Sequence, residues 1–254
     1  MAYMGRKTSS TSIYHVMARG INREKIFKQE RENRYFLKIL KQQLEKYEEI
    51  EIYAYCVMPT HMHILIKSEI QILSSFMAIV LAEYAEYYNY KHKRNGHVFQ
   101  GRFKSECVEN ISYFWSCVRY IHNNPVKSKI VEQADKYEFS SIKAYLQQKS
   151  QIIHENALKM CERDFSDILE FQRFHLKNQQ FVFMDIYPEL YLQELDIATQ
   201  ILLEMKEENK FERLSEVLEN KYLREKYLEK LRNTLQISRR ESQKIYLDIK
   251  KKVL

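Results

Sequence analysis

Two histidines, His61 and His63, lie one residue apart in the otherwise apolar segment MPTHMHILI, residues 58–66. Successive side chains of a strand point to opposite faces, so His61 and His63 would share one face while Met62 and Ile64 share the other. Two neutral imidazoles on one face can hold a divalent metal ion between them. A half-exposed strand that carries two polar residues explains the same pattern, so both interpretations stay open for this segment alone.

A second pair of reactive residues follows about sixty positions later, in the segment ISYFWSCVRYIHNNPV, residues 111–126. On a helix, one side would be an apolar stripe made of Ile111, Phe114, Trp115, Val118 and Ile121. Tyr120 falls roughly opposite this stripe, and Asn124 lies one turn further along the same face. Pro125 is expected to end the helix. A phenol hydroxyl and an amide oxygen are therefore predicted together at a helix end; a half-exposed tyrosine and a helix-terminal asparagine are the alternative.

The elements that must position these residues follow from the periodicity of the chain. It predicts, in order, strand 12–18, helix 31–47, strand 51–58, strand 61–67, helix 71–92, strand 97–108 and helix 111–123. This β-α-β-β-α-β order predicts an α+β fold, a ferredoxin-like antiparallel sheet with helices on one face. We expect His61 and His63 on the other face, which would then be free. The predicted domains are a catalytic domain, 1–150, and an all-α C-terminal region, 151–254.

Composition limits the class of protein. The chain has 254 residues, of which 45% are hydrophobic, enough for a sizeable core in one or two domains. Its four cysteines lack Cys-x-x-Cys spacing, which suits reduced thiols and argues against a structural zinc site. No apolar run reaches transmembrane length, and the N-terminal segment lacks the apolar core of a signal peptide. We therefore expect a soluble, cytoplasmic protein.

Charge is unevenly distributed along the chain. Residues 1–150 hold 23 Lys and Arg against 15 Asp and Glu, and residues 151–220 hold 7 against 15. Residues 221–254 hold 11 Lys and Arg against 4 Asp and Glu. Two basic segments that flank an acidic one favour a polyanionic partner, with nucleic acid as the first candidate. A solvated lysine-rich surface is the alternative.

Four segments together resemble the single-tyrosine HUH transposases, in particular the REP-associated tyrosine transposases: YHVMARGIN…IF (14–27), YCVMPTHMHILI (55–66), FQGRFKSE (99–106) and YIHNNPV (120–126). The resemblance covers roughly residues 8–145. It implies that Tyr120 is the nucleophile. It also implies that His61, His63 and Asn124 hold Mg²⁺ or Mn²⁺, and that the substrate is single-stranded DNA near hairpins.

This chemistry agrees with the residue types. A metal ion held there would polarise the scissile phosphodiester as a Lewis acid. Attack by Tyr120 on phosphorus would give a 5′-phosphotyrosine link and a free 3′-hydroxyl, and the retained bond energy would allow rejoining without ATP. Arg119 could assist deprotonation of Tyr120, clamp a phosphate or be a surface residue. Contacts with the DNA backbone are predicted for Arg19, Arg23, Lys25, Arg102 and Lys104.

The C-terminal segment predicts two more helices with a short turn between them. Ser238 and Glu241 form a capping-box pattern at the start of the last one. The pair resembles a helix-turn-helix near 222–254, whose second helix could enter a DNA groove. Its DNA-facing residues would be Arg239, Arg240 and Lys244. A basic helical hairpin that packs on the catalytic domain is the alternative.

The favoured interpretation is a metal-dependent transposase that cleaves and rejoins hairpin-associated DNA. A replication-initiator or relaxase-like nickase shares the two histidines and the tyrosine. A catalytically idle nucleic-acid-binding protein on the same fold is a further alternative. A hydrolytic metalloenzyme is also open, although no carboxylate cluster at matching spacing supports it. The sequence does not distinguish a monomer from a homodimer, nor action of Tyr120 in cis from action in trans.

Overall fold

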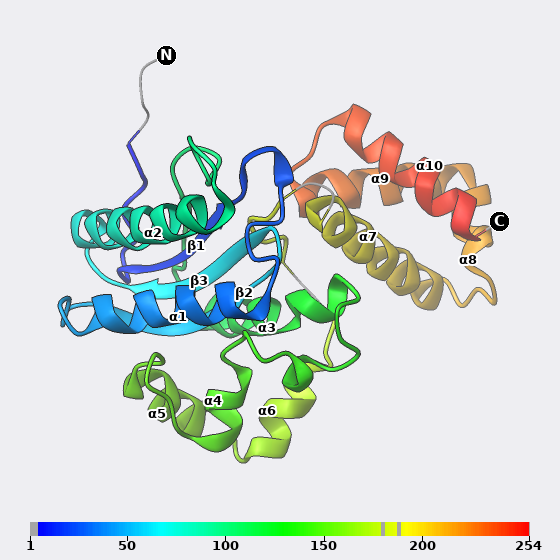
Figure 1. Cartoon of the computed structure of the whole chain (residues 1–254). Helices are drawn as coiled ribbons and strands as arrows, with labels where there is room; N and C mark the ends of the chain where they lie inside the picture. The colour runs from blue at the N-terminus through cyan, green and yellow to red at the C-terminus, as the bar shows by residue number, and fades with distance from the viewer. Residues whose placement is uncertain (1–4, 179–180, 187–188, 254) are drawn as a thin grey trace. The chain divides into compact units, whose positions relative to one another are not determined.

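The computed structural model describes residues 5–178, 181–186 and 189–253. The chain divides into two compact units, Met1–Lys177 and Asn178–Leu254, coloured from blue to yellow-green and from yellow to red in Figure 1. No helix among the described residues is long and apolar enough to cross a membrane.

The first unit contains a four-stranded antiparallel sheet with the strand order β2-β3-β1-β4. The strands are β1 (Ile13–Arg19), β2 (Glu51–Val57), β3 (His61–Lys67) and β4 (Lys104–Cys107). The central strands β1 and β3 are buried over most of their length. Residues directly opposite in neighbouring strands share a face, so the pairs Met17–His63 and Arg19–His61 fix which side chains accompany the histidines.

One face of the sheet is covered by α1 (Glu30–Leu44) and α2 (Ile70–His92), which lie in front of the sheet in Figure 1. The two helices contact each other through aromatic rings, with the centroids of Phe36 and Tyr84 5.5 Å apart. The side chains of β3 that alternate with the histidines point to this helix-covered face. Among them, Met62 and Ile64 are fully buried. This arrangement confirms the predicted α+β class and the predicted helix–strand order.

The opposite face is also covered, which corrects the prediction that helices lie on one face and leave the histidine face free. Helix α3 (Ile111–Lys127) packs there, with the ring of Tyr120 5.5 Å from that of His63. His61 is 1% and His63 0% exposed. The sequence pattern missed this layer because α3 has one apolar stripe, while the side with Tyr120 and Asn124 is polar and yet buried.

The other side of α3 packs against the helices that follow it. These are η2 (Ala134–Lys136), α4 (Ile142–Gln147), α5 (Glu155–Asp164) and α6 (Ile168–His175). Trp115 contacts the rings of Phe165 and Phe171 at centroid distances of 5.0 and 6.2 Å. The structure therefore divides the chain after Lys177 rather than at residue 150, because α5 and α6 belong to the layer that covers α3.

Two elements differ in length from the prediction. Of the expected strand 97–108, Lys104–Cys107 forms β4, and Phe99 makes one isolated antiparallel bridge to Gly20. Gly101, with a φ of +67°, breaks the extended chain between them. Helix α3 continues through Pro125 to Lys127 instead of ending at residue 123. Pro125 has no N–H to donate, but its carbonyl accepts the N–H of Ile130 at 2.9 Å. The helix can therefore end after Pro125, with this carbonyl hydrogen-bonded.

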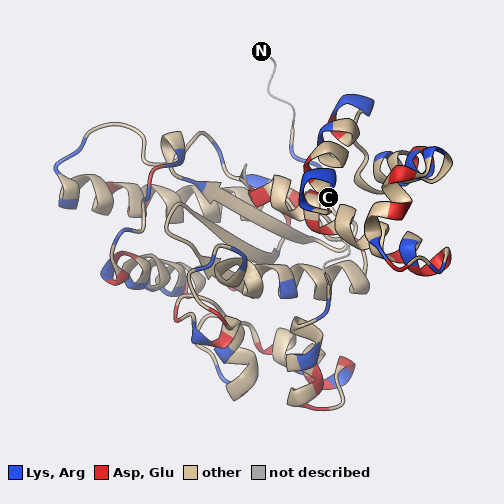
Figure 2. Ribbon diagram, turned by 90° about the vertical axis from the view of Figure 1, so that its right-hand side faces the viewer, with Lys and Arg blue, Asp and Glu red and all other residues tan. Residues whose placement is uncertain are grey.

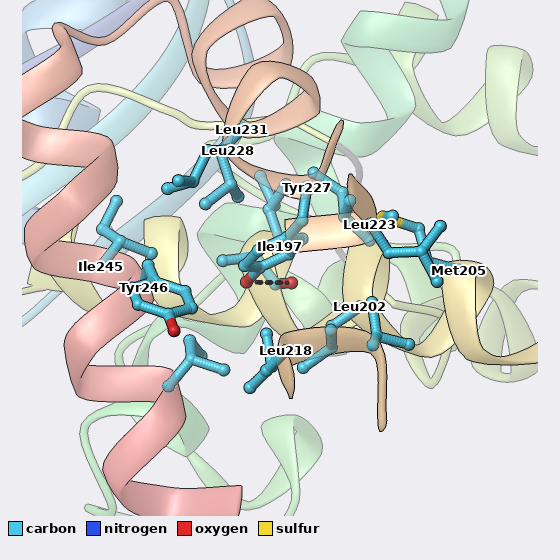
Figure 3. Close-up of a cluster of buried hydrophobic side chains, with 14 of the residues drawn as sticks. Ile197, Leu202, Met205, Leu218, Leu223, Tyr227, Leu228, Leu231, Ile245 and Tyr246 are labelled. Carbon is cyan, nitrogen blue, oxygen red and sulfur yellow. Dashed lines mark hydrogen bonds between the residues drawn. The ribbon is translucent and has the colours of Figure 1, made fainter. Parts of the chain in front are cut away.

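The described residues of the second unit form a bundle of four helices, α7 (Glu189–Glu208), α8 (Leu214–Glu219), α9 (Lys221–Leu235) and α10 (Arg239–Val253). Its core is a cluster of buried apolar side chains, and the hydroxyl of Tyr227 donates to the carbonyl of Ala198 within it at 3.0 Å (Figure 3). Ser238 and Glu241 form the predicted capping box at the start of α10, with Ser238 Oγ donating to Glu241 Oε2 at 2.7 Å. Gln236 takes the left-handed conformation that ends α9, with a φ of +54°.

Candidate active site

The first histidine of the site is held at the start of β3 by the loops around it. The N–H of Met58 donates to the carbonyl of His61 at 2.8 Å, and the N–H of Gly20 donates to that of Thr60 at 2.8 Å. A side chain at Gly20 would not fit, since its Cβ would lie 2.4 Å from the carbonyl oxygen of Glu24. Within this frame, Nδ1 of His61 is hydrogen-bonded to Thr60 Oγ1 at 2.8 Å, so Nε2 is the nitrogen that would ligate a metal ion.

The second histidine is held by a third one that the sequence analysis did not select. Nδ1 of His63 lies 2.8 Å from Nε2 of His15 on β1, and their rings stack with centroids 5.0 Å apart. His15 is fully buried, and its Nδ1 lies 3.6 Å from a carboxylate oxygen of Glu106 on β4. Nδ1 of His63 is therefore occupied as in His61, and Nε2 is again the nitrogen that would ligate. Ring nitrogens of His61 and His63 lie within 4.8 Å of each other.

Helix α3 brings Tyr120 against this group. Its ring contacts His63 and His15 edge to face, with centroids 5.5 and 5.8 Å apart. Helical spacing places Cys117 and Asn124 on the same side of α3 as Tyr120. The helix begins where the side chain of Asn110 accepts the N–H of Tyr113 at 2.9 Å. The expected grouping of two imidazoles and a phenol is therefore present in the first unit.

Asn124 is 2% exposed and lies one helical turn after Tyr120. Its Nδ2 is buried and makes no hydrogen bond with the part of the chain that the structure describes. A buried amide nitrogen without a partner is costly, and an amide can be turned so that its oxygen takes that position. One amide oxygen and two imidazole nitrogens are a donor set that a divalent ion accepts, and Asn124 follows by one turn the tyrosine whose ring contacts His63, so these residue types fit a metal site.

The predicted DNA contacts of the first unit lie mainly at one end of the sheet. Arg19 is directly opposite His61 in the β1–β3 pairing and therefore shares its face. Arg23 and Lys25 are exposed in the loop after β1, which is held to the β2–β3 turn by the bond from Ile26 N–H to Pro59 O at 2.9 Å. Figure 2 shows Lys and Arg in several loops that join these elements. Arg102 and Lys104 are exposed around the start of β4.

Arg119 has a different place from the one expected. It is 3% exposed, its guanidinium lies 4.5 Å from the ring centroid of Phe174, and it donates to the Phe174 carbonyl at 3.3 Å. Burial lowers the pKa of Arg119. The side chain is therefore directed toward α6, because the stretch of α3 that carries it is covered on both sides. A DNA-facing role for Arg119 does not agree with this burial.

A second buried histidine pair, His122 and His175, lies on the α6 side of α3. His122 Nδ1 is 2.9 Å from His175 Nε2, and His122 Nε2 is 2.9 Å from Ser141 Oγ. Burial lowers the pKa of His175 to about 4 and that of His122 well below its ordinary value. Every ring nitrogen of this pair has a protein partner, since His175 Nδ1 lies 2.8 Å from the Phe171 carbonyl. The pair is structural.

This pair predicts acid sensitivity of the fold. His175 stays neutral in the folded state down to pH of about 4, whereas in the unfolded chain it takes up a proton near pH 6.5. Its contribution is therefore present above pH 6.5 and is lost as the pH falls toward 4. The loss for His175 alone approaches about 3 kcal/mol. Urea unfolding at pH 7 and pH 5 should show this decline, and it should be shallower in His175→Gln; an equal decline in both proteins would contradict the assignment.

The remaining predicted residues, Arg239, Arg240 and Lys244, are exposed on α10 in the second unit. Sequence analysis missed His15 and Glu106. The one available signal was alternation in β1, where His15, Met17 and Arg19 must share a face. That signal becomes useful only when the strand register is known, because the register pairs Met17 with His63 and His15 with Glu106.

Comparisons with known proteins concern mainly the first unit. Residues 8–124 match the model of the family described as IS200-like transposases. None of the curated proteins matches the chain. The chain is similar to the solved structure of a REP-associated tyrosine transposase bound to a REP hairpin, with 19% identity, a TM-score of 0.49, and coverage of 61% of this chain and 92% of that one. It is also similar to a protein named as a transposase from Deinococcus radiodurans R1, with 16% identity, a TM-score of 0.34, and coverage of 52% and 96%.

Proposed function

Because residues 8–124 match the IS200-like transposase family, we propose that the chain cleaves and rejoins single-stranded DNA at hairpin-associated sites through a 5′-phosphotyrosine intermediate. The observation that carries the proposal is the contact of the Tyr120 ring with His63, beside His61. A phenol nucleophile beside two imidazoles with oriented Nε2 atoms suits phosphodiester transfer better than hydrolysis, because the tyrosine itself becomes the carrier of the DNA end.

The metal site would be formed by His61, His63 and Asn124. Both imidazoles have their Nδ1 atoms engaged, and Asn124 contributes a buried amide. A bound Mg²⁺ or Mn²⁺ would supply Lewis-acid polarisation of the scissile phosphate. These ligands are all neutral, so they would leave the positive charge of the ion undiminished where the phosphate binds.

Tyr120 supplies the nucleophile. Its phenol oxygen loses a proton and attacks phosphorus, a bond from that oxygen to phosphorus forms, and the bond from phosphorus to the 3′ oxygen breaks. The departing 3′ oxygen takes up a proton and becomes a hydroxyl. A 3′-hydroxyl from the same or another strand reverses the step and joins the DNA. Arg19, which shares the face of His61, would hold a neighbouring phosphate.

The nucleophile and one of the predicted metal ligands are buried, which limits the access of DNA to them. Tyr120 is 0% exposed and His61 is 1% exposed. A DNA strand therefore reaches these side chains only when the site opens, so we expect DNA binding and opening to be coupled.

The direct test is the covalent adduct. End-labelled single-stranded hairpin DNA is incubated with the full chain and Mn²⁺, and the products are separated on a denaturing gel. We expect a labelled band of protein–DNA mass and a free 3′-hydroxyl fragment. Binding of several hairpins without any cleavage would favour an idle binding module, and cleavage without an adduct would favour a hydrolytic metalloenzyme.

We further propose that α10 in the second unit binds duplex DNA, the double-stranded stem of the hairpin. One side of α10 is buried in the bundle core through Ser242, Ile245, Tyr246 and Ile249. The opposite side carries exposed basic residues at helical spacing, which we name the α10 stripe: Arg240, Lys244 and Lys251. The stripe spans about 16 Å, and an α-helix fits the major groove of DNA.

Neutralising the α10 stripe tests this proposal. The triple variant Arg240→Gln, Lys244→Gln and Lys251→Gln should weaken binding of a duplex stem and reduce the slope of log affinity against log salt by about 2 to 3. Binding is measured by fluorescence anisotropy at several salt concentrations. The control neutralises Lys210, Lys221 and Lys226, which are exposed elsewhere in the second unit. Equal losses in the two triple variants would indicate a general charge effect and contradict a binding surface on α10.

A further inference from the structure

The chain of contacts behind His63 gives His15 a role in the site. We infer that His15 is a positioning residue: it fixes the tautomer and the orientation of His63, so that Nε2 of His63 presents its lone pair to the metal ion. The inference rests on the proposed metal site and adds to it three residues that do not touch the ion: His15, Glu106 and Tyr113.

A series of contacts connects Tyr113 and Glu106, at the edge of the sheet, to His63 in the site. The side chain of Tyr113 on α3 is hydrogen-bonded to Glu106, and burial raises the pKa of Tyr113, so its hydroxyl keeps its proton and donates. Glu106 on β4 is directly opposite His15 on β1, and its carboxylate lies 3.6 Å from His15 Nδ1. His15 Nε2 then lies 2.8 Å from His63 Nδ1.

These contacts favour one placement of the protons. The negative carboxylate of Glu106 favours the proton of neutral His15 on Nδ1, the nitrogen that faces it. Nε2 of His15 is then an acceptor, so the bond to His63 requires a proton on His63 Nδ1. A neutral imidazole carries only one proton, and Nε2 of His63 therefore carries a lone pair, which is the form that ligates metal.

The rings also define an orientation. The planes of His15 and His63 are 26° apart with centroids at 5.0 Å, and both rings contact Tyr120 edge to face. His15 is 0% exposed, so its ring has little freedom to move. The pair His122–His175 provides a contrast in the same unit, because it is stacked in the same way with rings 5.1 Å apart but ends on the carbonyl of Phe171 rather than a carboxylate.

The test compares two substitutions of His15. His15→Phe keeps an aromatic ring against His63 and Tyr120 but removes the acceptor, whereas His15→Gln keeps an amide oxygen in reach of His63 Nδ1. Binding of Mn²⁺ to the full chain is followed by electron paramagnetic resonance of the free ion. We expect His15→Phe to weaken Mn²⁺ binding by about 10- to 100-fold and His15→Gln to restore most of the affinity. The control His175→Gln removes one ring from the contrasting pair and should leave Mn²⁺ affinity unchanged.

A second measurement reads the tautomer directly and does not depend on any variant folding. Nitrogen-15 correlation spectra of the imidazoles in the metal-free wild type should show His63 protonated on Nδ1. A proton on Nε2 of His63, or wild-type Mn²⁺ affinity in a folded His15→Phe protein, would overturn the role of His15. Absence of Mn²⁺ binding by the wild type would overturn the metal site itself and the inference with it. Intact wild-type binding combined with unchanged His15→Phe binding would overturn only the inference.

Discussion

Replacement of Tyr120 by Phe is expected to abolish the covalent protein–DNA adduct while leaving the fold and the affinity for hairpin DNA intact. The substitution removes one oxygen, the one that would attack phosphorus, and keeps the ring that contacts His63 and His15 at 5.5 and 5.8 Å. Loss of a single buried hydroxyl changes stability by about 1 kcal/mol. The adduct band on the denaturing gel should disappear at every concentration of divalent metal, because no metal ion replaces a missing nucleophile.

The matched control for this variant is Tyr137→Phe. Tyr137 is also buried in the first unit, and its hydroxyl donates to the carbonyl of Val57 at 2.7 Å. Tyr137→Phe removes the same atom as Tyr120→Phe, but the ring of Tyr137 packs against Phe139, with centroids 5.8 Å apart. Adduct formation should persist in Tyr137→Phe. An adduct that survives in Tyr120→Phe would show that another tyrosine is the nucleophile.

Substitution of His61 by Ala is expected to abolish cleavage by a different route, the loss of a metal ligand. Affinity for Mn²⁺ should fall by more than about 100-fold, since even the loss of an outer-shell partner costs 10- to 100-fold. Adduct formation should fall with it and recover in part at high Mn²⁺, because Tyr120 and the other ligands remain. Isothermal titration with Mn²⁺ and the adduct gel, run in parallel, separate this behaviour from that of Tyr120→Phe.

His97→Ala is the control for the ligand variant, because His97 is an exposed histidine in the loop before β4. It should bind Mn²⁺ and form the adduct as the wild type does. Full cleavage by His61→Ala at low Mn²⁺ would contradict the assignment of His61 as a ligand. Together, the two variants and their controls distinguish a transposase from a passive DNA-binding protein on the same fold.

Local spacing was enough to predict the order of the elements in the sheet domain. Apolar alternation located β3 at residues 61–67, as observed, and helical periodicity located α2 within one residue of its observed start. The same rules placed His61 and His63 on one face, because a strand has a period of two. They also placed Asn124 one turn after Tyr120, because a helix has a period of 3.6 residues. These are properties of neighbouring residues, and sequence determines them.

Tertiary structure decided the properties that depend on long-range pairing. The register of β1 against β3 and β4 brings His15 between His63 and Glu106, which are 48 and 91 positions away in the sequence. The layer formed by α3 to α6 covers the histidine face and buries Arg119, although the sequence of α3 showed a single apolar stripe with Tyr120 opposite it. The physical reason is that a side chain is buried only when a second element packs against the face that carries it. The sequence by itself therefore determined which side chains share a face, and the packing decided what that face meets.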